Sequence, residues 1–219
     1  MESFTELDGP AVASLSRATT DVVVFPGGSG GGQAKAIGES GSAAVKAFVA
    51  AGGGYYGTCA GGYLGAAASC CDVAMPGYCG GKVGCHPSAY GLGLLDAGVA
   101  EPWDRGHGLV EAIYTKEAVD MLHLSDRYAD GPVSLLYYQG PIFAASYGPG
   151  NFTAGAFFLS EIADKHPEFT TKQMVGTPAL IWGTFGAGRV LISPPHPEET
   201  VPRLDDVVLA YTLWAGRAI

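Results

Sequence analysis

In the first third of the chain, short apolar runs alternate with longer runs that have helical spacing or are rich in alanine. Two short apolar runs, residues 21–25 and 54–58, end in glycine-rich segments, which is typical of buried strands that enter tight turns. Between them, residues 42–51 place apolar side chains three and four positions apart and stop at three glycines, which predicts a helix. The alanine-rich run 60–69 predicts a second helix. This alternation indicates parallel strands covered by helices.

The remaining pattern completes the expected fold. Residues 109–114, 133–138 and 142–147 favour strands, and residues 156–163 favour a helix. Residues 179–193 hold two β-rich runs around a Gly-Ala-Gly turn, which predicts a hairpin, and residues 204–214 have helical spacing. We therefore predict an α/β fold in one domain, residues 1–219. It is expected to be a flavodoxin-like three-layer sandwich with a mostly parallel sheet and a C-terminal β-hairpin.

Composition and charge narrow the range of partners. The chain is 47% hydrophobic with 34 glycines, and its net charge of −9 disfavours phosphate backbones and anionic membranes. Residues 47–71 carry no charge, but their many glycines fit a buried strand, turn and helix better than a membrane span. We expect a small-molecule substrate, and we expect neither nucleic acid nor a membrane as partner. The oligomeric state stays open.

The stretch GTCAGG places Cys59 between a predicted strand and a predicted helix. Small neighbours allow the sharp turn that projects a nucleophile into the cleft at the carboxyl ends of parallel strands. A helix N-terminus also favours thiolate over thiol. The alternative is a small buried cysteine that only fills the core.

A thiolate needs a base, and the base needs an orienting partner. His196 follows the last predicted strand directly, and Glu198 lies two residues further along the same proline-rich loop, with Glu199 as its backup. The amides of Gly28 and Ala60 are predicted to hold an oxyanion. Substrate contacts are expected from the loop after the first strand, at Gly27, Ser29 and Gln33.

Five segments together resemble a known superfamily: VVVFPGGSGGG, GTCAGGYLGAA, YYQGPIF, MVGTPALIWGTFGAGRVLIS and SPPHPEE. They are similar to class I glutamine amidotransferase-like domains, above all to the domain at the N-terminus of some biotin-protein ligases. The resemblance runs from residue 21 to the chain end. It implies a Cys59–His196–Glu198 triad and an oxyanion loop at Gly28. No ligase catalytic domain is present, so biotin transfer is not expected.

The predicted activity is hydrolysis of a small amide or related carbonyl compound through a thioester on Cys59. Two departures from the resemblance motivate an alternative, a non-catalytic module that binds a ligand or partner. Few residues precede position 21, where related folds place an additional strand and helix, and no synthetase sequence is present to accept ammonia. A further alternative is a relative of the DJ-1 and PfpI proteins, which share the elbow but usually draw their acid from elsewhere in the fold.

Four cysteines other than Cys59 lie within 16 residues, namely Cys70, Cys71, Cys79 and Cys85. Local disulfides and a secretory origin are one interpretation, which the acceptor triplet at Asn151 would fit, and reduced thiols in the cytoplasm are the other. Zinc bound by these cysteines and His86 is a weaker alternative because closely paired ligands are missing. We expect no metal and no cofactor. Structural roles are expected for His86, His107, His123 and His166, and core positions for Tyr55, Tyr56 and Tyr63.

Overall fold

The computed structural model describes residues 5–71, 80–101, 106–144, 147, 150–162 and 174–217. Its strands are β1 (Val22–Phe25), β2 (Gly54–Thr58), β3 (Ala66–Cys71), β4 (Gly84–Pro87), β5 (Leu95–Glu101), β6 (His107–Tyr114), β7 (Val133–Tyr138), β8 (Phe152–Phe158), β9 (Pro178–Phe185) and β10 (Gly188–Ser193). Its α-helices are α1 (Gly30–Ala50), α2 (Ala60–Gly65), α3 (Lys116–Met121) and α4 (Asp205–Ala215), with 3-10 turns η1 (Pro10–Ser14) and η2 (Asp126–Tyr128).

A seven-stranded sheet in the order β1-β2-β10-β9-β8-β6-β7 forms the centre of the molecule. Only the pairs β1–β2 and β2–β10 are parallel, and the other four pairs are antiparallel. The mixed α/β class is therefore confirmed, but the expectation of a mostly parallel sheet is wrong. Strands β6 to β9 have only antiparallel neighbours, and the β6–β7 connection, which contains α3, leads to an antiparallel pair and not to a parallel crossover.

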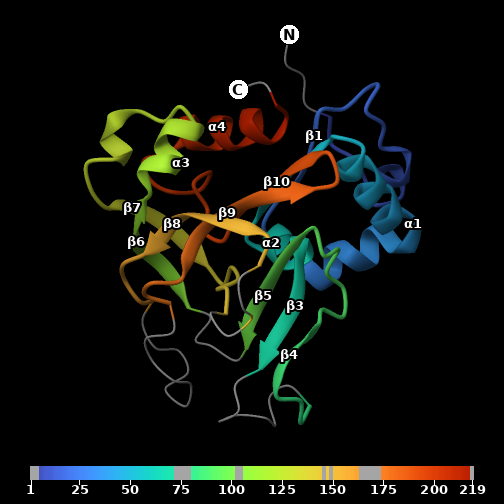
Figure 1. Ribbon diagram of the computed structural model, residues 1–219, viewed down its shortest axis with the longest axis horizontal. Coiled ribbons are helices and arrows are strands. Elements are labelled where there is room, and N and C mark those ends of the chain that lie inside the picture. Colours follow the sequence, from blue (N-terminus) through green and yellow to red (C-terminus); the bar gives the residue numbers. More distant parts are fainter. Residues whose placement is uncertain are drawn as a thin grey trace.

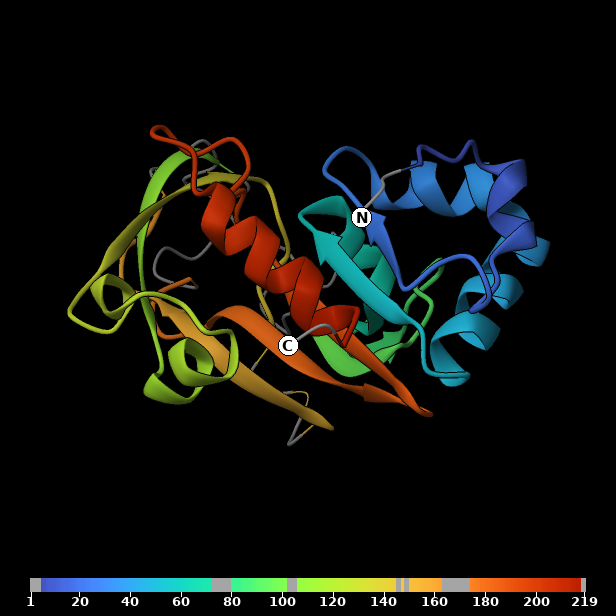
Figure 2. The same cartoon turned by 90° about the horizontal axis from the view of Figure 1, so that it is seen from above.

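Helices cover both faces of the parallel part of the sheet (Figures 1 and 2). Successive side chains of a strand point to opposite faces, so Tyr55 packs with Phe48 of α1, whereas Tyr56 packs with Tyr211 of α4. A small sheet, in the order β4-β3-β5, lies on the α1 side and adds Leu95 to that core. The result is two apolar clusters separated by the main sheet.

The first helix is longer than predicted, because it includes glycine-rich sequence that is predicted to be a loop. Helix α1 begins at Gly30, inside the predicted glycine loop, and continues past Ser42 to Ala50. Ser29 caps it by accepting a hydrogen bond from the amide of Gly32, and Gly38, with φ of 64°, interrupts its regular course. Strand β1 is the edge of the main sheet, and residues 5–20 contain only η1, without a further strand.

Two of the predicted helices are corrected. The run 60–69 is helical only over α2, because from Ala66 onward the backbone pairs with β5 as strand β3. The run 156–163 lies partly in β8, which pairs with β6 and β9, and residue 163 lies outside the described residues. Sheet pairing outweighs local helix propensity in both places.

Other predictions from the middle and end of the chain can be compared directly. The strands expected at 109–114 and 133–138 are β6 and β7, and the hairpin at 179–193 is β9–β10, closed at Gly186. The helix expected at 204–214 is α4. The strand expected at 142–147 is wrong: Phe143 makes a single bridge to Val99, and residues 145 and 146 lie outside the described residues.

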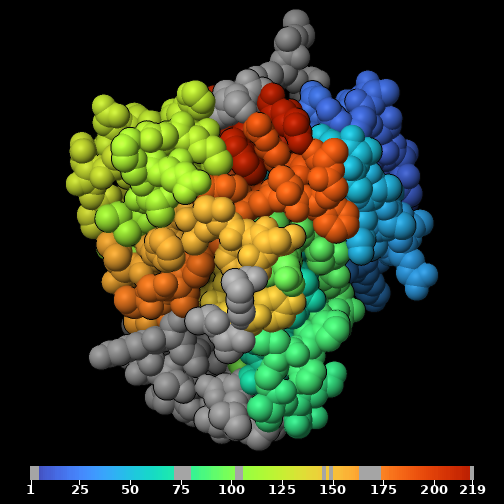
Figure 3. All heavy atoms as spheres, viewed as in Figure 1, coloured from blue at the N-terminus to red at the C-terminus, as the bar shows by residue number. Residues whose placement is uncertain are grey.

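The cysteine cluster forms a disulfide in the small sheet. Cys70 and Cys85 face each other on β3 and β4 and are bonded, so a local bridge is confirmed. Cys71 is also disulfide-bonded, and Cys79 lies outside the described residues. Figure 3 shows the chain around β4 (green) at the molecular surface. Within the described residues, no helix has the length and apolar character needed to cross a membrane.

Candidate active site

Three neighbouring strands bring distant parts of the chain together at one edge of the sheet. In the parallel ladder, Phe25 of β1 lies beside Gly57 of β2, and Thr58 lies beside Ser193 of β10. The glycine loop, the Cys59 turn and the His196 loop leave these strand ends in the same direction. Because parallel strands have their carboxyl ends at one edge, the three segments form a common rim.

Cys59 has the strained backbone of an elbow. Its φ of 47° and ψ of −103° are unusual for a residue with a side chain, and its amide donates to the Ser193 carbonyl at 3.0 Å. A Cβ on Gly61 would lie 2.2 Å from the carbonyl oxygen of Phe25, and one on Gly57 would lie 2.6 Å from that of Gly61. The small residues around Cys59 therefore permit α2 to pack directly on β1 and β2.

His196 is held from both sides of its loop. Its Nδ1 lies 2.7 Å from Oε1 of Glu198, while Glu199 is exposed. The His196 amide donates to the carbonyl of Leu136 in β7 at 2.7 Å. The hydroxyl of Thr200 donates to the His196 carbonyl and accepts the amide of Leu136. These bonds attach the loop after β10 to an antiparallel strand on the far side of the site.

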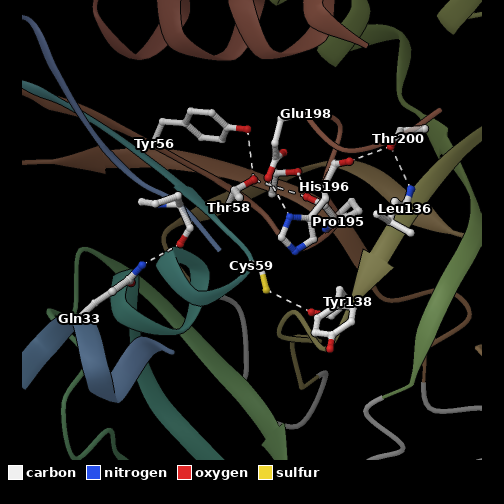
Figure 4. Close-up of polar contacts among 12 residues, drawn as sticks. Gln33, Tyr56, Thr58, Cys59, Leu136, Tyr138, Pro195, His196, Glu198 and Thr200 are labelled. Carbon is white, nitrogen blue, oxygen red and sulfur yellow. Dashed lines mark hydrogen bonds and ion pairs between the residues drawn. The ribbon is translucent and has the colours of Figure 1, made fainter. Parts of the chain in front are cut away.

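The electrostatic setting of His196 favours the imidazolium. Burial lowers its pKa, but interactions with Cys59 and with Glu198 outweigh burial and raise the pKa from 6.5 to about 10. The Sγ of Cys59 donates to the carbonyl of Tyr138 at 3.2 Å, and the buried Nε2 of His196 has no hydrogen-bond partner among the described residues. In this structure the thiol thus donates to a backbone carbonyl, although Cys59 is one of the two groups that raise the pKa of His196. Figure 4 shows His196 and Tyr138 on either side of Cys59.

The glycine loop that follows β1 lies beside His196 and Cys59, and its residues differ in their contacts. A Cβ on Gly27 would lie 2.6 Å from Cε1 of His196, so this glycine fits against the imidazole. Gly28 has φ of 127°, and a Cβ at this position would meet no atom within 4 Å. The side chain of Gln33 donates to the Pro26 carbonyl at 2.7 Å (Figure 4), so it supports the loop from behind. Its substrate-binding role, like those of Gly27 and Ser29, stays a prediction.

A pocket of about 190 Å³ opens beside the Cys59 thiol. It is lined by residues 28–31 and by Cys59, Tyr63, Tyr90, Tyr138 and Gln139. Gln33 and His196 do not line it. The site predicted from the sequence lacks four of them, namely Tyr63, Tyr90, Tyr138 and Gln139. Tyr63 is also buried in the apolar cluster on the α1 side, so its predicted core position is confirmed. The segment YYQGPIF carried a signal for two of the four, since it is part of the resemblance, whereas nothing in the sequence distinguished Tyr90.

Other sequence predictions concern possible metal ligands and the histidines other than His196, for which structural roles are expected. In the described part of the chain, no cluster of three or more cysteine, histidine, aspartate or glutamate side chains has a geometry suited to a metal ion. A ring nitrogen of His86 lies 2.9 Å from the carbonyl of Val83, and the ring of His107 lies 5.2 Å from that of Tyr138. His166 lies outside the described residues.

Comparison with known proteins defines the class of fold. The chain superposes on the crystal structure of a glutamine amidotransferase with a TM-score of 0.57 and 20% identity, covering 90% of this chain and 79% of that one. A cytoplasmic protein from Salmonella typhimurium gives a TM-score of 0.50 and 11% identity over 94% and 78% of the two chains. The domain is therefore amidotransferase-like in fold.

Part of the chain also matches a model of a protein family. Residues 16–76, which include β1, α1, β2 and the Cys59 turn, match the family described as biotin-protein ligase, N terminal. The resemblance drawn from the sequence is thereby confirmed. No curated protein sequence shows significant similarity to the chain.

Proposed function

We propose that the protein is a cysteine-dependent hydrolase of a small amide or related carbonyl compound, with Cys59 as nucleophile. The single observation that carries this proposal is the meeting of the elbow and the His196–Glu198 pair at the ends of β2 and β10. The proposal treats residues 1–219 as one domain, with the parallel strands β1, β2 and β10 as its flavodoxin-like part.

The proposed reaction begins from the charge state that the site favours. With a pKa of about 10, His196 is protonated at neutral pH, and Cys59 is proposed to react as the thiolate beside it. The sulfur attacks the carbonyl carbon, and the amides of Gly28 and Ala60 hold the resulting oxyanion. When the C–N bond breaks, His196 gives its proton to the leaving nitrogen and a thioester remains.

Hydrolysis of the thioester completes the cycle. Neutral His196 takes a proton from water, whose oxygen attacks the thioester carbon, and the C–S bond breaks to release the acid. Glu198 accepts from Nδ1 throughout, which fixes the ring and stabilises the imidazolium. To enter this cycle, Sγ must turn from the Tyr138 carbonyl toward Nε2.

Covalent trapping tests the proposal. Among the described residues, Cys59 is the free cysteine, so an uncharged alkylating reagent such as iodoacetamide can be assigned to it by peptide mass spectrometry without reduction. We expect one adduct at Cys59, formed much more slowly in His196→Ala, and hydrolysis of p-nitrophenyl acetate that is lost in Cys59→Ala. Cys59→Ala with full esterase activity, or an adduct only at another cysteine, would contradict the proposal.

The second candidate is a binding pocket without turnover on the same fold. The observation in its favour is the resting arrangement, in which the thiol donates to Tyr138 and Nε2 has no partner among the described residues. Under this alternative, His196→Ala leaves the alkylation rate of Cys59 unchanged. A DJ-1 or PfpI relative is less favoured, because the acid that contacts His196 is Glu198 of the same loop. For either function, the proposed ligand is a small molecule, with no cofactor, nucleic acid or membrane required.

A further inference from the structure

The pocket beside Cys59 has no charged side chain in its lining. Its polar groups are the hydroxyls of Ser29 and the tyrosines, the amide of Gln139 and the thiol itself. A free amino-acid amide such as glutamine would carry an ammonium and a carboxylate into this space without a partner of opposite charge. Because the lining offers no side chain of opposite charge, the acyl group that reaches Cys59 is expected to be uncharged.

A second, larger groove continues from this pocket. It has a volume of about 520 Å³ and shares Gly31 and Tyr90 with the pocket beside Cys59. A Cβ on Gly31 would lie 3.8 Å from the Tyr90 ring, so the ring lies over the start of α1 between the two spaces. A molecule that passes Tyr90 therefore moves from an uncharged pocket onto the outer surface of α1.

The groove is lined by one basic and one acidic side chain. Lys35 and Glu39 both line it, on either side of the interruption of α1 at Gly38, with Lys35 nearer to the Cys59 pocket in the sequence of α1. Both side chains belong to exposed residues, and neither forms an ion pair with another described residue. At Gly38, which also lines the groove, the φ of 64° interrupts the helix, and such a break frees backbone polar groups for other partners.

We propose that the substrate is an amide carried by a short peptide-like chain. Its uncharged acyl end enters the Cys59 pocket, and the chain then passes Tyr90 into the α1 groove, where an acidic group meets Lys35 and a basic group further along meets Glu39. This inference deepens the proposed function and rests on it, since it assigns the substrate of the same site.

Two peptides of equal composition test the order of charges. Each carries a chloroacetyl group, whose carbon forms the C–S bond with Cys59 as chloride leaves. The first is chloroacetyl-Gly-Glu-Gly-Lys-amide, and the second exchanges Glu and Lys. Rates are normalised to those with free cysteine and compared with 2-chloroacetamide. We expect the first peptide to react ~5 to 10 times faster than the second, the range that exposed ion pairs support.

A charge exchange on the protein gives the decisive result. Lys35→Glu with Glu39→Lys should invert the preference between the two peptides. Its control is Lys116→Glu with Asp120→Lys on α3, which has the same sequence spacing and charge signs, as an ion pair on a helix that packs in the other apolar cluster, and it should leave the preference unchanged. Equal rates for both peptides, or a preference that the exchange leaves intact, would overturn the inference.

Failure of the proposed function gives a different result. In that case 2-chloroacetamide reacts with Cys59 at the same rate in the wild type and in His196→Ala, whatever the peptides do. Dependence on His196 combined with equal peptide rates retains the hydrolase and rejects only the peptide-like substrate. The two hypotheses are thus separated by one set of rate measurements.

Discussion

The pocket beside Cys59 has an inner and an outer wall of opposite character. The inner wall consists of Cys59, which lines the pocket, and of Gly27 and the His196 loop behind it, which do not. Cys59 and His196 are nearly inaccessible, at 4% and 5% exposure. The outer wall consists of Tyr90 and Tyr138, which are 39% and 53% exposed. The proposed nucleophile and base are therefore held by close packing on the inner side, whereas the outer side is exposed surface.

The two walls also differ in how the chain builds them. The chain segments of the inner wall follow directly after β1, β2 and β10, which are adjacent and parallel. Their relative positions therefore follow from the pairing of these strands in the main sheet. The outer wall combines the end of antiparallel β7 with the segment after β4, which belongs to the other sheet. Substitutions in the inner wall should therefore change reactivity strongly, and substitutions in the outer wall should change it weakly.

The largest effect is expected from a methyl group in the inner wall. In Gly27→Ala the new Cβ would lie 2.6 Å from Cε1 of His196, so the imidazole must move. Displacement of a catalytic group by ~1 Å lowers rates by ~100-fold, and we expect this loss in Cys59 alkylation and in ester hydrolysis. Gly131→Ala is the control, because a Cβ there meets no atom within 4 Å. Retention of the wild-type rate by Gly27→Ala would show that the imidazole position does not matter.

The same contrast explains which parts of the site the sequence could reveal. Cys59, His196 and Glu198 each follow a strand whose apolar pattern is clear, so the convergence of their chain segments could be predicted from parallel pairing. The outer wall depends on where β4 and β7 end in space. Tyr90 follows a four-residue strand with no apolar pattern, and no local signal indicates that it reaches the Cys59 pocket.

Errors in the fold prediction have a related physical origin. The run after Cys59 is rich in alanine and resembles a helix locally, but pairing with β5 makes its second half a strand. Long-range pairing of this kind leaves little trace in a window of ten residues. The antiparallel half of the sheet was missed for the same reason, although β6, β7 and the β9–β10 hairpin were each predicted as strands.

Removing the carboxylate behind the imidazole should produce the next largest effect. In Glu198→Gln the pKa of His196 should fall from about 10 toward 6.5, because the charge and the strong acceptor are lost. NMR titration of the His196 ring measures this directly. Reactivity at neutral pH should fall ~10-fold or more, as for a general acid–base group in the wrong charge state. Glu199→Gln, next to it and exposed, is the matched control and should change neither quantity.

The sign of the pH dependence follows from the same shift. Because the folded-state pKa of His196 is raised above 6.5, its protonated form adds stability that is complete below about pH 6.5 and is lost as the pH rises toward 10. The difference in free energy of unfolding between wild type and Glu198→Gln should therefore shrink over this interval. Denaturant unfolding at several pH values measures it, and a constant difference would contradict the raised pKa.

A smaller effect is expected where the inner wall is attached to the antiparallel half of the sheet. Thr200→Val removes the hydroxyl that joins the His196 carbonyl to the Leu136 amide. The Leu136 amide loses its acceptor, whereas the His196 carbonyl keeps the amides of Glu199 and Thr200. The free energy of unfolding should therefore fall by ~1–3 kcal/mol, and we expect a reactivity loss well below that of Gly27→Ala. Thr184→Val, on an exposed position of β9, should be close to neutral. Equal behaviour of the two variants would mean that the hydroxyl does not support the loop.

The smallest effect should come from the outer wall and would complete the comparison. Tyr138→Ala removes an exposed ring from the pocket but keeps the backbone carbonyl that accepts the Cys59 thiol. We therefore expect less than a ~3-fold change in alkylation by 2-chloroacetamide and a free energy of unfolding within ~0.5 kcal/mol of the wild type, as for surface substitutions. A loss as large as that of Gly27→Ala would show that the ring itself positions the thiol. Because the carbonyl is unchanged in this variant, such a result would assign the outer wall a part in the chemistry and remove the distinction between the two walls.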